Sequence, residues 1–258
     1  MAERLLETDE VADELTPEMA EMFEPADTPT DNAPTQRIGA GGPVVLKDRD
    51  MLDTATPLPA FDSPSAKAYL VEDRRDLGLK LFALICSSEI PPRITTIRQQ
   101  KESDFSGRLD LIDWDVIYWP TEGRSFRTFI FERPKGKRLD DFSLLRPNVF
   151  TEAVLVKEVF PQFVKILETL HEKEQTYRAF RPDNVFWDAQ TSTITLGDCV
   201  TTPPGFLQPV VYEPVESAMT MPVARGKGIF VDDIYSLAVL MLGMHLGTDF
   251  SKEEQYLD

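Results

Sequence analysis

Two oxygen-bearing side chains in the second half of the chain could together hold a divalent cation. Asn184 ends the octapeptide YRAFRPDN, which begins at Tyr177, and Asp198 lies fourteen positions further on, in the pentapeptide LGDCV. Two oxygen ligands suit Mg²⁺, which usually completes its coordination shell with water and phosphate. The alternative is that both side chains only hydrogen-bond the backbone of their own loops. The sequence favours neither interpretation over the other.

These two segments resemble the catalytic core of a Hanks-type serine/threonine protein kinase. In that family a His-Arg-Asp triplet opens the catalytic loop and its aspartate accepts the proton of the substrate hydroxyl, while an asparagine and the aspartate of Asp-Phe-Gly hold magnesium. The triplet positions here are Tyr177, Arg178 and Ala179. A methyl group can neither accept a proton nor orient a hydroxyl. The resemblance therefore implies a pseudokinase, in which Ala179 stands at the position of the catalytic base.

The resemblance runs from about Ala66 to Gly247 and implies an α+β, two-lobed fold. We expect an antiparallel β lobe over residues 46–134 and a truncated helical lobe over residues 135–258. The matching segments follow one another in the family's order: two strands at 66–73 and 80–86, the strand before the hinge at 129–134, a turn at 136–139, a long helix at 151–172, the end of an activation segment at 212–216 and the start of a central helix at 233–239.

Some matching residues are expected to support the fold rather than the chemistry. Arg178, Glu216 and Asp233 occupy positions that, in the resembled fold, satisfy backbone groups and buried charge. The segment 151–172 has apolar residues at spacings of three and four, which predicts a helix with one buried face. That face is expected to comprise Val156, Val159, Phe160, Phe163, Leu167 and Leu170.

The residues that would bind a nucleotide depart from the family's pattern. An active kinase covers the phosphates with a glycine-rich loop, but the corresponding stretch Phe61–Ser65 contains no glycine. The position of the phosphate-binding lysine is occupied by Cys86, which carries no charge. The hinge backbone, which reads the adenine edge in kinases, corresponds to Glu132–Pro134, where Pro134 lacks an amide donor. The resemblance thus implies at most weak binding of ATP and Mg²⁺, with Glu132, Pro134 and Cys86 beside the nucleotide.

An active atypical serine/threonine kinase, or another ATP-dependent transferase, is the alternative from the enzyme class. Asp183 or Asp188 would then have to replace the missing base, because a kinase fold can carry altered chemistry. Cys86 and Cys199 could also face each other across the cleft as a thiol switch. Two small buried hydrophobic residues are the simpler interpretation of these cysteines.

The pseudokinase resemblance implies a protein-interaction or regulatory scaffold whose partner is another protein, and composition predicts that the protein is cytoplasmic. Of the 258 residues, 42% are apolar, which is enough for a substantial core. The two cysteines lack the spacing of a disulfide framework or a zinc site. No apolar run approaches the roughly 20 residues of a membrane span, and the N-terminus is acidic where a signal peptide would be basic. A net charge of −17 argues against binding to nucleic acid or an anionic membrane.

Residues 1–45 are expected to form an acidic, disordered leader. Residues 1–40 hold eleven acidic and two basic residues, a net charge of −9, together with several prolines. Such a composition cannot bury enough apolar surface to order itself. Around Thr16–Phe23, however, Leu15, Met19, Met22 and Phe23 would share one helical face, so this segment could dock in a partner's groove. A solvated tail is the simpler interpretation; the alternative makes the leader the partner-binding element and the fold its anchor.

The segment Ile234–Leu246 is apolar nearly all round, which predicts burial on every side. In the resembled fold, further helices cover this segment. Two interpretations follow: the sequence belongs to a longer protein, or a second subunit covers the surface. We favour the first.

Overall fold

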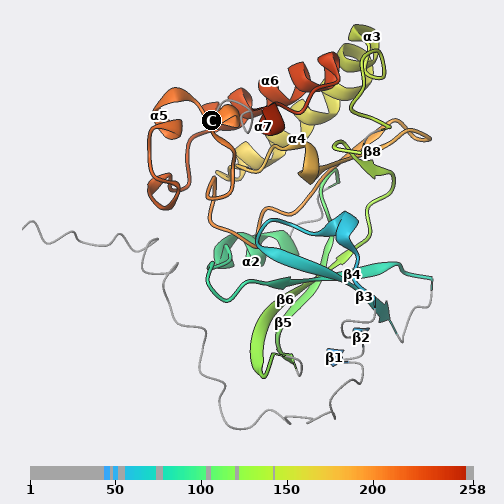
Figure 1. The fold of residues 1–258 in the computed structure, drawn as a ribbon, viewed down its shortest axis with the longest axis vertical. Helices are drawn as coiled ribbons and strands as arrows, with labels where there is room; N and C mark the ends of the chain where they lie inside the picture. The colour runs from blue at the N-terminus through green and yellow to red at the C-terminus, as the bar shows by residue number, and fades with distance from the viewer. Residues whose placement is uncertain are drawn as a thin grey trace, which may run out of the picture. The chain divides into compact units, whose positions relative to one another are not determined.

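The computed structural model describes residues 44–46, 49–51, 56–73, 78–102, 106–119, 122–141 and 143–253. The amphipathic segment predicted around Thr16–Phe23 lies outside these residues. The described residues belong to a unit that spans Thr35–Asp258. They form a six-stranded sheet and a helical part that contains a three-stranded sheet (Figure 1). This mixture of helices and antiparallel strands agrees with the predicted α+β class.

The six-stranded sheet is antiparallel throughout, and its strand order is β1-β2-β3-β4-β6-β5. The edge strands β1 and β5 contact each other, so the sheet curls toward closure. Strands β3 and β4 match the two strands predicted from the sequence to within one residue. The strands are β1 (Val44–Leu46), β2 (Arg49–Met51), β3 (Ala66–Asp73), β4 (Leu81–Cys86), β5 (Leu111–Trp119) and β6 (Arg124–Glu132).

Every residue of β4 is buried, because both faces of the sheet are covered. Side chains alternate between the two faces of a strand, so Leu81, Ala83 and Ile85 pack in one apolar cluster with residues of β1 and β5. The alternate residues Phe82, Leu84 and Cys86 pack in a second cluster. That second cluster includes Ile97 of helix α2 (Ile94–Glu102) and Val200 of the helical part. Cys86 therefore lies on the sheet face that meets the helical part.

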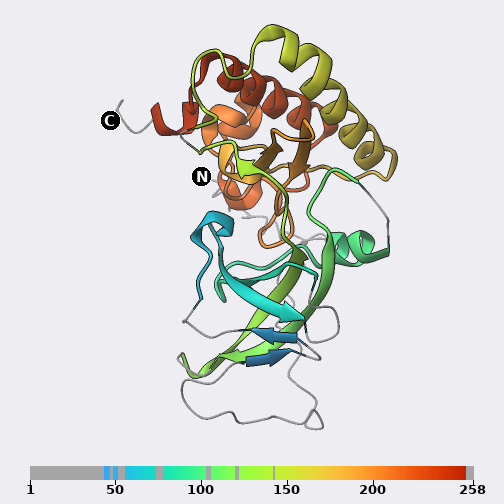
Figure 2. The same cartoon turned by 90° about the vertical axis from the view of Figure 1, so that its right-hand side faces the viewer.

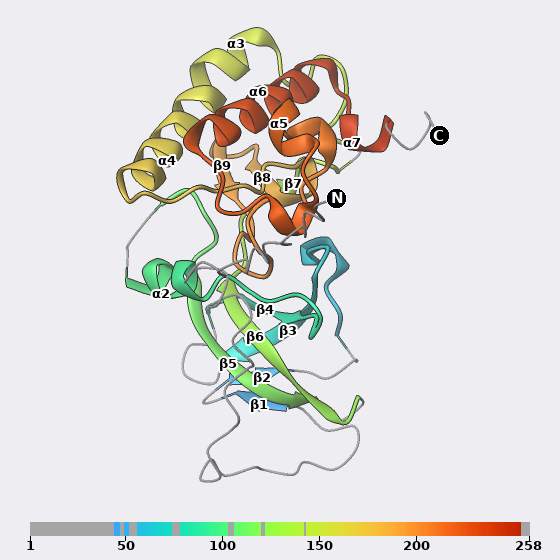
Figure 3. The ribbon, with the colours of Figure 1, turned by 90° about the vertical axis from the view of Figure 1, so that its left-hand side faces the viewer.

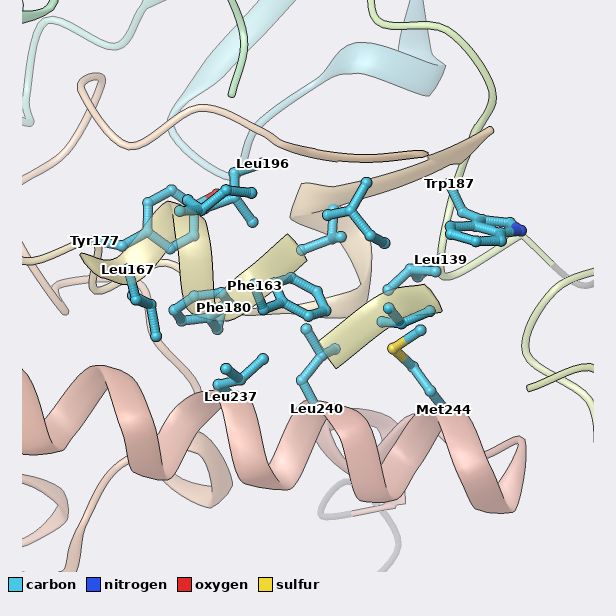
Figure 4. Close-up of a cluster of buried hydrophobic side chains, with 14 of the residues drawn as sticks. Leu139, Phe163, Leu167, Tyr177, Phe180, Trp187, Leu196, Leu237, Leu240 and Met244 are labelled. Carbon is cyan, nitrogen blue, oxygen red and sulfur yellow. The ribbon is translucent and has the colours of Figure 1, made fainter. Parts of the chain in front are cut away.

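The helical part is built around two helices and the small sheet β7-β8-β9 (Figure 4). From helix α6 (Phe230–Leu246), Leu237 and Leu240 point toward the side chains of Phe180 and Phe163, and Met244 points toward Leu139 (Figure 4). The elements are β7 (Lys137–Arg138), α3 (Glu152–Val154), a π-helical turn (Leu155–Val159), α4 (Phe160–Glu172), β8 (Val185–Asp188), β9 (Thr193–Leu196), α5 (Val215–Ala218), α6 (Phe230–Leu246) and α7 (Phe250–Glu253). Short 3₁₀ turns lie at Pro59–Phe61, Pro182–Asn184, Val210–Tyr212 and Pro222–Ala224.

The predicted helix at 151–172 exists, but part of its buried face is wrong. Val156 is 58% exposed and Phe160 is 44% exposed, whereas Leu155 and Ile166 are buried. The π-helical turn over Leu155–Val159 has more residues per turn than an α-helix, so a face drawn at α-helical spacing does not pass through it unchanged. The remaining predicted side chains, Val159, Phe163, Leu167 and Leu170, are buried.

Helix α6 is buried on one side rather than on every side. Leu237, Leu240 and Met244 lie in the core, while Ile234, Leu242 and Leu246 are exposed. The expectation of all-round burial is therefore not met by the described residues, although the helix is as apolar as predicted. Within the described part of the chain, no helix has both the length and the apolar character that a membrane crossing needs.

Candidate functional site

Asp233 on α6 fixes the backbone at the start of the segment 177–184. Its two carboxylate oxygens accept hydrogen bonds from the backbone N–H groups of Tyr177 and Arg178, both at 2.7 Å. Arg178 has a φ of 53°, in the left-handed region that side chains other than glycine rarely adopt. The two hydrogen bonds hold this unfavourable backbone in place, which is the supporting role expected of Asp233.

The Arg178 side chain is fully buried in a cluster of charges. Its guanidinium lies 2.8 Å from the carboxylate of Glu213 and 2.8 Å from that of Asp232. Burial raises the pKa of Glu213, although the guanidinium groups of Arg178 and Arg225 oppose the shift. Breaking such a cluster by removing one partner is costly, because it leaves buried charge uncompensated.

The expectation that Glu216 supports the fold is wrong, because Glu213 takes that place. Glu213 is buried directly after the 3₁₀ turn Val210–Tyr212, which directs its side chain inward. Glu216 lies in the first turn of α5 and is exposed. The two glutamates are three residues apart, so residue type and approximate spacing could not distinguish them.

Ala179 is buried among apolar side chains of the helical core and is only 6% exposed. Its neighbour Tyr177 is also buried, and its ring packs edge-on against Phe180 with centroids 4.7 Å apart. The carbonyl oxygen of Ala179 accepts a hydrogen bond from the Asn184 side chain at 3.0 Å. The segment is thus tightly packed, and at position 179 it presents a methyl group.

Asn184 and Asp198, the two predicted metal ligands, lie next to each other. The side-chain nitrogen Nδ2 of Asn184 donates to the Asp198 carbonyl at 2.7 Å and to the Tyr177 hydroxyl at 2.9 Å. On its other side, a Cβ atom at Gly197 would approach Asn184 Oδ1 to 2.3 Å, so the glycine permits this close packing. The Asn184 amide therefore binds the backbone on both sides of the site.

The Asp198 carboxylate is directed into its own turn. It accepts hydrogen bonds from the N–H groups of Val200 at 2.9 Å and Thr201 at 3.2 Å, and from the Thr201 hydroxyl. Burial raises the pKa of Asp198, and these three hydrogen bonds oppose the shift. Both carboxylate oxygens thus have partners within the turn.

The glycine-free stretch 61–65 is hydrogen-bonded to that same turn. The hydroxyl oxygens of Ser65 and Ser63 lie 2.9 Å and 3.2 Å from the Thr201 hydroxyl. Ser65 and Thr201 are both buried, although 136 positions separate them in the chain. The stretch that would cover the phosphates in a kinase therefore contacts the segment around Asp198 directly.

Comparison with known proteins identifies the fold. No family model and no curated protein matches the sequence. The structure, however, is similar to that of the protein kinase Rad53, residues 1–466, in complex with AMP-PNP, with a TM-score of 0.52 and 16% sequence identity. The match covers 77% of this chain and 46% of the Rad53 chain. The fold is kinase-like. At this identity the similarity extends to the fold alone.

In this kinase-like fold, the predicted hinge offers few free backbone donors. The N–H of Glu132 donates to the Asp110 carbonyl at 3.1 Å, and the N–H of Arg133 donates to the Lys80 carbonyl at 2.8 Å. Pro134 has no N–H to donate. Glu132 and Pro134 instead line a cavity of about 320 Å³ together with Arg108, Asp188 and Thr195, and Cys86 is not part of its lining.

The two cysteines are free thiols that belong to the packed interior. Cys86 is buried, while Cys199 is partly buried against the same apolar cluster. Burial, and to a smaller extent the nearby Asp198 carboxylate, raises the pKa of Cys86 well above its ordinary value. The thiol at the position of the kinase lysine therefore stays neutral and has low reactivity.

The two aspartates considered as replacement bases are engaged in their own loops. Asp183 pairs with Arg181 at 2.9 Å. Asp188 accepts hydrogen bonds from the Gln190 N–H at 2.9 Å and the Thr191 hydroxyl at 2.8 Å, and these bonds lower its pKa. Among the described residues, no group of three or more histidine, cysteine, aspartate or glutamate side chains is placed to hold a metal ion.

One residue that links the parts of the site was missed by sequence reasoning. Arg93, just before α2, donates from its guanidinium to three carbonyl oxygens, those of Thr176, Tyr177 and Cys199, at 3.0 to 3.2 Å. It thereby ties α2 to both loops of the site. All three acceptors are backbone groups, which every residue type carries, so the sequence held no signal for these contacts.

Proposed function

We propose that this protein is a pseudokinase: a two-lobed, kinase-like domain that transfers no phosphate and serves as a cytoplasmic interaction module for another protein. The observation that carries the proposal is Ala179, a buried methyl group in the segment that supplies the proton acceptor in an active kinase. Phosphoryl transfer depends almost entirely on positioning and charge stabilisation, and a methyl group contributes neither.

The side chains around this position are engaged within the protein or carry no charge for a phosphate. The Asn184 amide nitrogen binds three acceptors of the protein itself, and both oxygens of the Asp198 carboxylate accept hydrogen bonds from Val200 and Thr201. Cys86 provides a neutral thiol where a phosphate-binding lysine would be charged. We therefore assign these groups to the scaffold.

The interaction role is supported by the apolar surface of the helical part. Monomeric proteins rarely expose large apolar patches unless something binds them. From the 3₁₀ turn Val210–Tyr212 to the end of α6 many large apolar side chains are exposed: Val210, Val215, Met219, Met221, Val223, Ile229, Phe230, Val231, Ile234, Tyr235, Leu242 and Leu246. The partner is accordingly a protein with an apolar surface, because the net charge of −17 disfavours nucleic acid and anionic membranes.

Phosphate transfer from radiolabelled ATP, with Mg²⁺ and generic protein substrates, tests the proposal directly. We expect no transfer above background by the wild-type protein. Transfer that disappears in Asp198→Ala would refute the proposal and favour the active atypical kinase.

The interaction surface has its own test. Met219, which directly follows α5 and is 85% exposed, is replaced by glutamate, and Glu216→Gln within α5 serves as the control. We expect Met219→Glu to reduce ANS fluorescence or, if a second copy covers the surface, to shift the sedimentation coefficient toward the monomer. If neither signal changes, the surface is not an interaction site.

A further inference from the structure

The segment Leu58–Ser65 is firmly attached to strand β3. The Leu58 N–H donates to the Ala68 carbonyl at 2.8 Å, and the Ser63 N–H donates to the Ala66 carbonyl at 3.0 Å. Between these two anchors the chain forms the 3₁₀ turn Pro59–Phe61. Figures 2 and 3 show this light-blue turn on the side of the six-stranded sheet that faces the helical part.

Phe61 bridges the two sheets of the protein. Its ring is stacked on Phe82 of β4, with centroids 5.0 Å apart, and on Phe186 of β8, with centroids 5.9 Å apart; the interplanar angle is 29° in both pairs. Phe82 in turn stacks on Phe131, the residue before Glu132 of the predicted hinge. The Phe61 ring thus contacts one aromatic side chain from each sheet, Phe82 and Phe186, and lies beside β6, the strand that leads to the predicted hinge.

Polar contacts from the helical part hold the segment in this position. The hydroxyls of Ser63 and Ser65 meet Thr201, as described above, and Arg138 donates to the Asp62 carbonyl at 3.2 Å. Arg138 is itself oriented by two hydrogen bonds to the Asp140 carboxylate, each 3.0 Å long. The contacts come from two separate stretches of chain, so they restrain the segment along its length.

We infer that Phe61 is an internal occupant of the cleft: its ring takes the place between Phe82 and Phe186 that would otherwise accept a flat aromatic heterocycle, such as a purine. The inference rests on the proposed function and deepens it, because it gives a reason for nucleotide exclusion that is independent of the missing base. Stacking between two aromatic faces suits any planar ring. The hinge offers a ligand few hydrogen-bond donors, because the N–H groups of Glu132 and Arg133 already donate to the carbonyls of Asp110 and Lys80.

Replacing Phe61 by alanine tests the inference. Removal of the ring leaves a cavity between the two remaining aromatic side chains, and apolar cavities of this kind bind planar ligands. Adenosine is the probe, because it lacks phosphates and so needs neither Mg²⁺ nor a lysine. Phe150→Ala is the control: Phe150 also belongs to an aromatic pair, with Trp187 at 5.6 Å, but it is fully buried in the helical core, whereas Phe61 is partly buried.

We expect isothermal titration to give an adenosine Kd at least about tenfold lower for Phe61→Ala than for the wild type or Phe150→Ala. The inference is overturned if the wild type binds adenosine as tightly as Phe61→Ala, or if Phe61→Ala has a native circular dichroism spectrum and does not bind. Should Phe61→Ala not fold, the double variant Ser63→Ala/Ser65→Ala keeps the ring but removes its tether to Thr201. Tighter adenosine binding than wild type then supports the inference, and unchanged binding overturns it.

The outcome is separable from that of the proposed function. A wild-type protein that transfers no phosphate but binds adenosine as tightly as Phe61→Ala would retain the proposed function and lose the cleft inference. A wild-type protein that transfers phosphate would lose the proposed function whatever Phe61→Ala binds.

Discussion

Replacing Arg178 by methionine should be among the most destabilising single changes in the described part of the chain. The Arg178 side chain is fully buried and lies 2.8 Å from each of two carboxylates, those of Glu213 and Asp232. Methionine has a similar length but no charge, so the two acids would be left without this cation. Removing one partner of a buried ion pair typically costs about 3–5 kcal/mol. The left-handed backbone at position 178 is strained in both proteins and does not contribute to the difference.

Arg124→Met is the matched control for this change. Arg124 pairs with Glu122 at the same distance, 2.8 Å, but both side chains are about half exposed. Surface pairs of this kind contribute about 0–1 kcal/mol. Urea unfolding measures both variants: since small proteins have m-values of roughly 1–3 kcal/mol/M, the midpoint for Arg178→Met should fall by about 1 M or more. Equal, small shifts for both arginines would refute the argument from burial.

The pKa of Glu213 gives the same prediction a second readout. Burial already raises this pKa in the wild type, and the loss of Arg178 removes a charge that opposes the shift. The penalty from ionised Glu213 is absent below its ordinary pKa and develops as the pH rises through the raised value. The destabilisation by Arg178→Met should therefore shrink as the pH falls, and Glu213→Gln in the Arg178→Met background should restore part of the lost stability at neutral pH. A destabilisation that is independent of pH would contradict this account.

Two further substitutions test the site and the core. Burial raises the pKa of Asp198 above its ordinary value of 3.8, so the ionised carboxylate disfavours folding. The stability of Asp198→Asn relative to wild type should therefore increase as the pH rises from about 4 to 8. A relative stability that falls over this range would contradict the assignment. On α6, Leu240→Ala should lower the free energy of unfolding by about 2–5 kcal/mol, because Leu240 is buried. Leu242→Ala, at a site that is half exposed, should change the free energy of unfolding by less than about 0.5 kcal/mol. Equal effects would show that both faces of the helix are covered.

Local sequence patterns predicted most of the secondary structure around the site. Strands β3 and β4 agree with the ranges that the resemblance to a protein kinase implied. Helix α4 was predicted from its apolar spacing, but the π-helical turn before it was not. In the sequence, the spacing of Val156 and Phe160 is compatible with the apolar face of a regular α-helix. The order of the kinase-like segments indicated the fold class, which the structural similarity supports.

Contacts between distant segments were beyond the sequence. In the sequence, Phe61 is an apolar residue in a loop, and the residues beside it in the chain do not indicate that its ring stacks on Phe186, 125 positions away. Ser65 and Thr201 are common polar residues whose hydrogen bond depends on how the two sheets meet. The sequence identified the missing glycines and the missing lysine, but it could not show that the Phe61 ring stacks on both Phe82 and Phe186.

The proposed function also explains why a loop without a catalytic base is held so firmly. Arg178, Glu213 and Asp232 form a buried charged network, which stabilises a fold less efficiently than apolar packing of the same volume, and Asp233 binds the adjoining backbone. What such a network does provide is a fixed position for the backbone of residues 177–179, which carries Tyr177 into the core and lets the Ala179 carbonyl bind Asn184. These contacts join α6 to β8 and to the Asp198 turn. The loop therefore connects the helical core to the Asp198 turn, so a substitution that loosens it should disturb the apolar surface of α5 and α6.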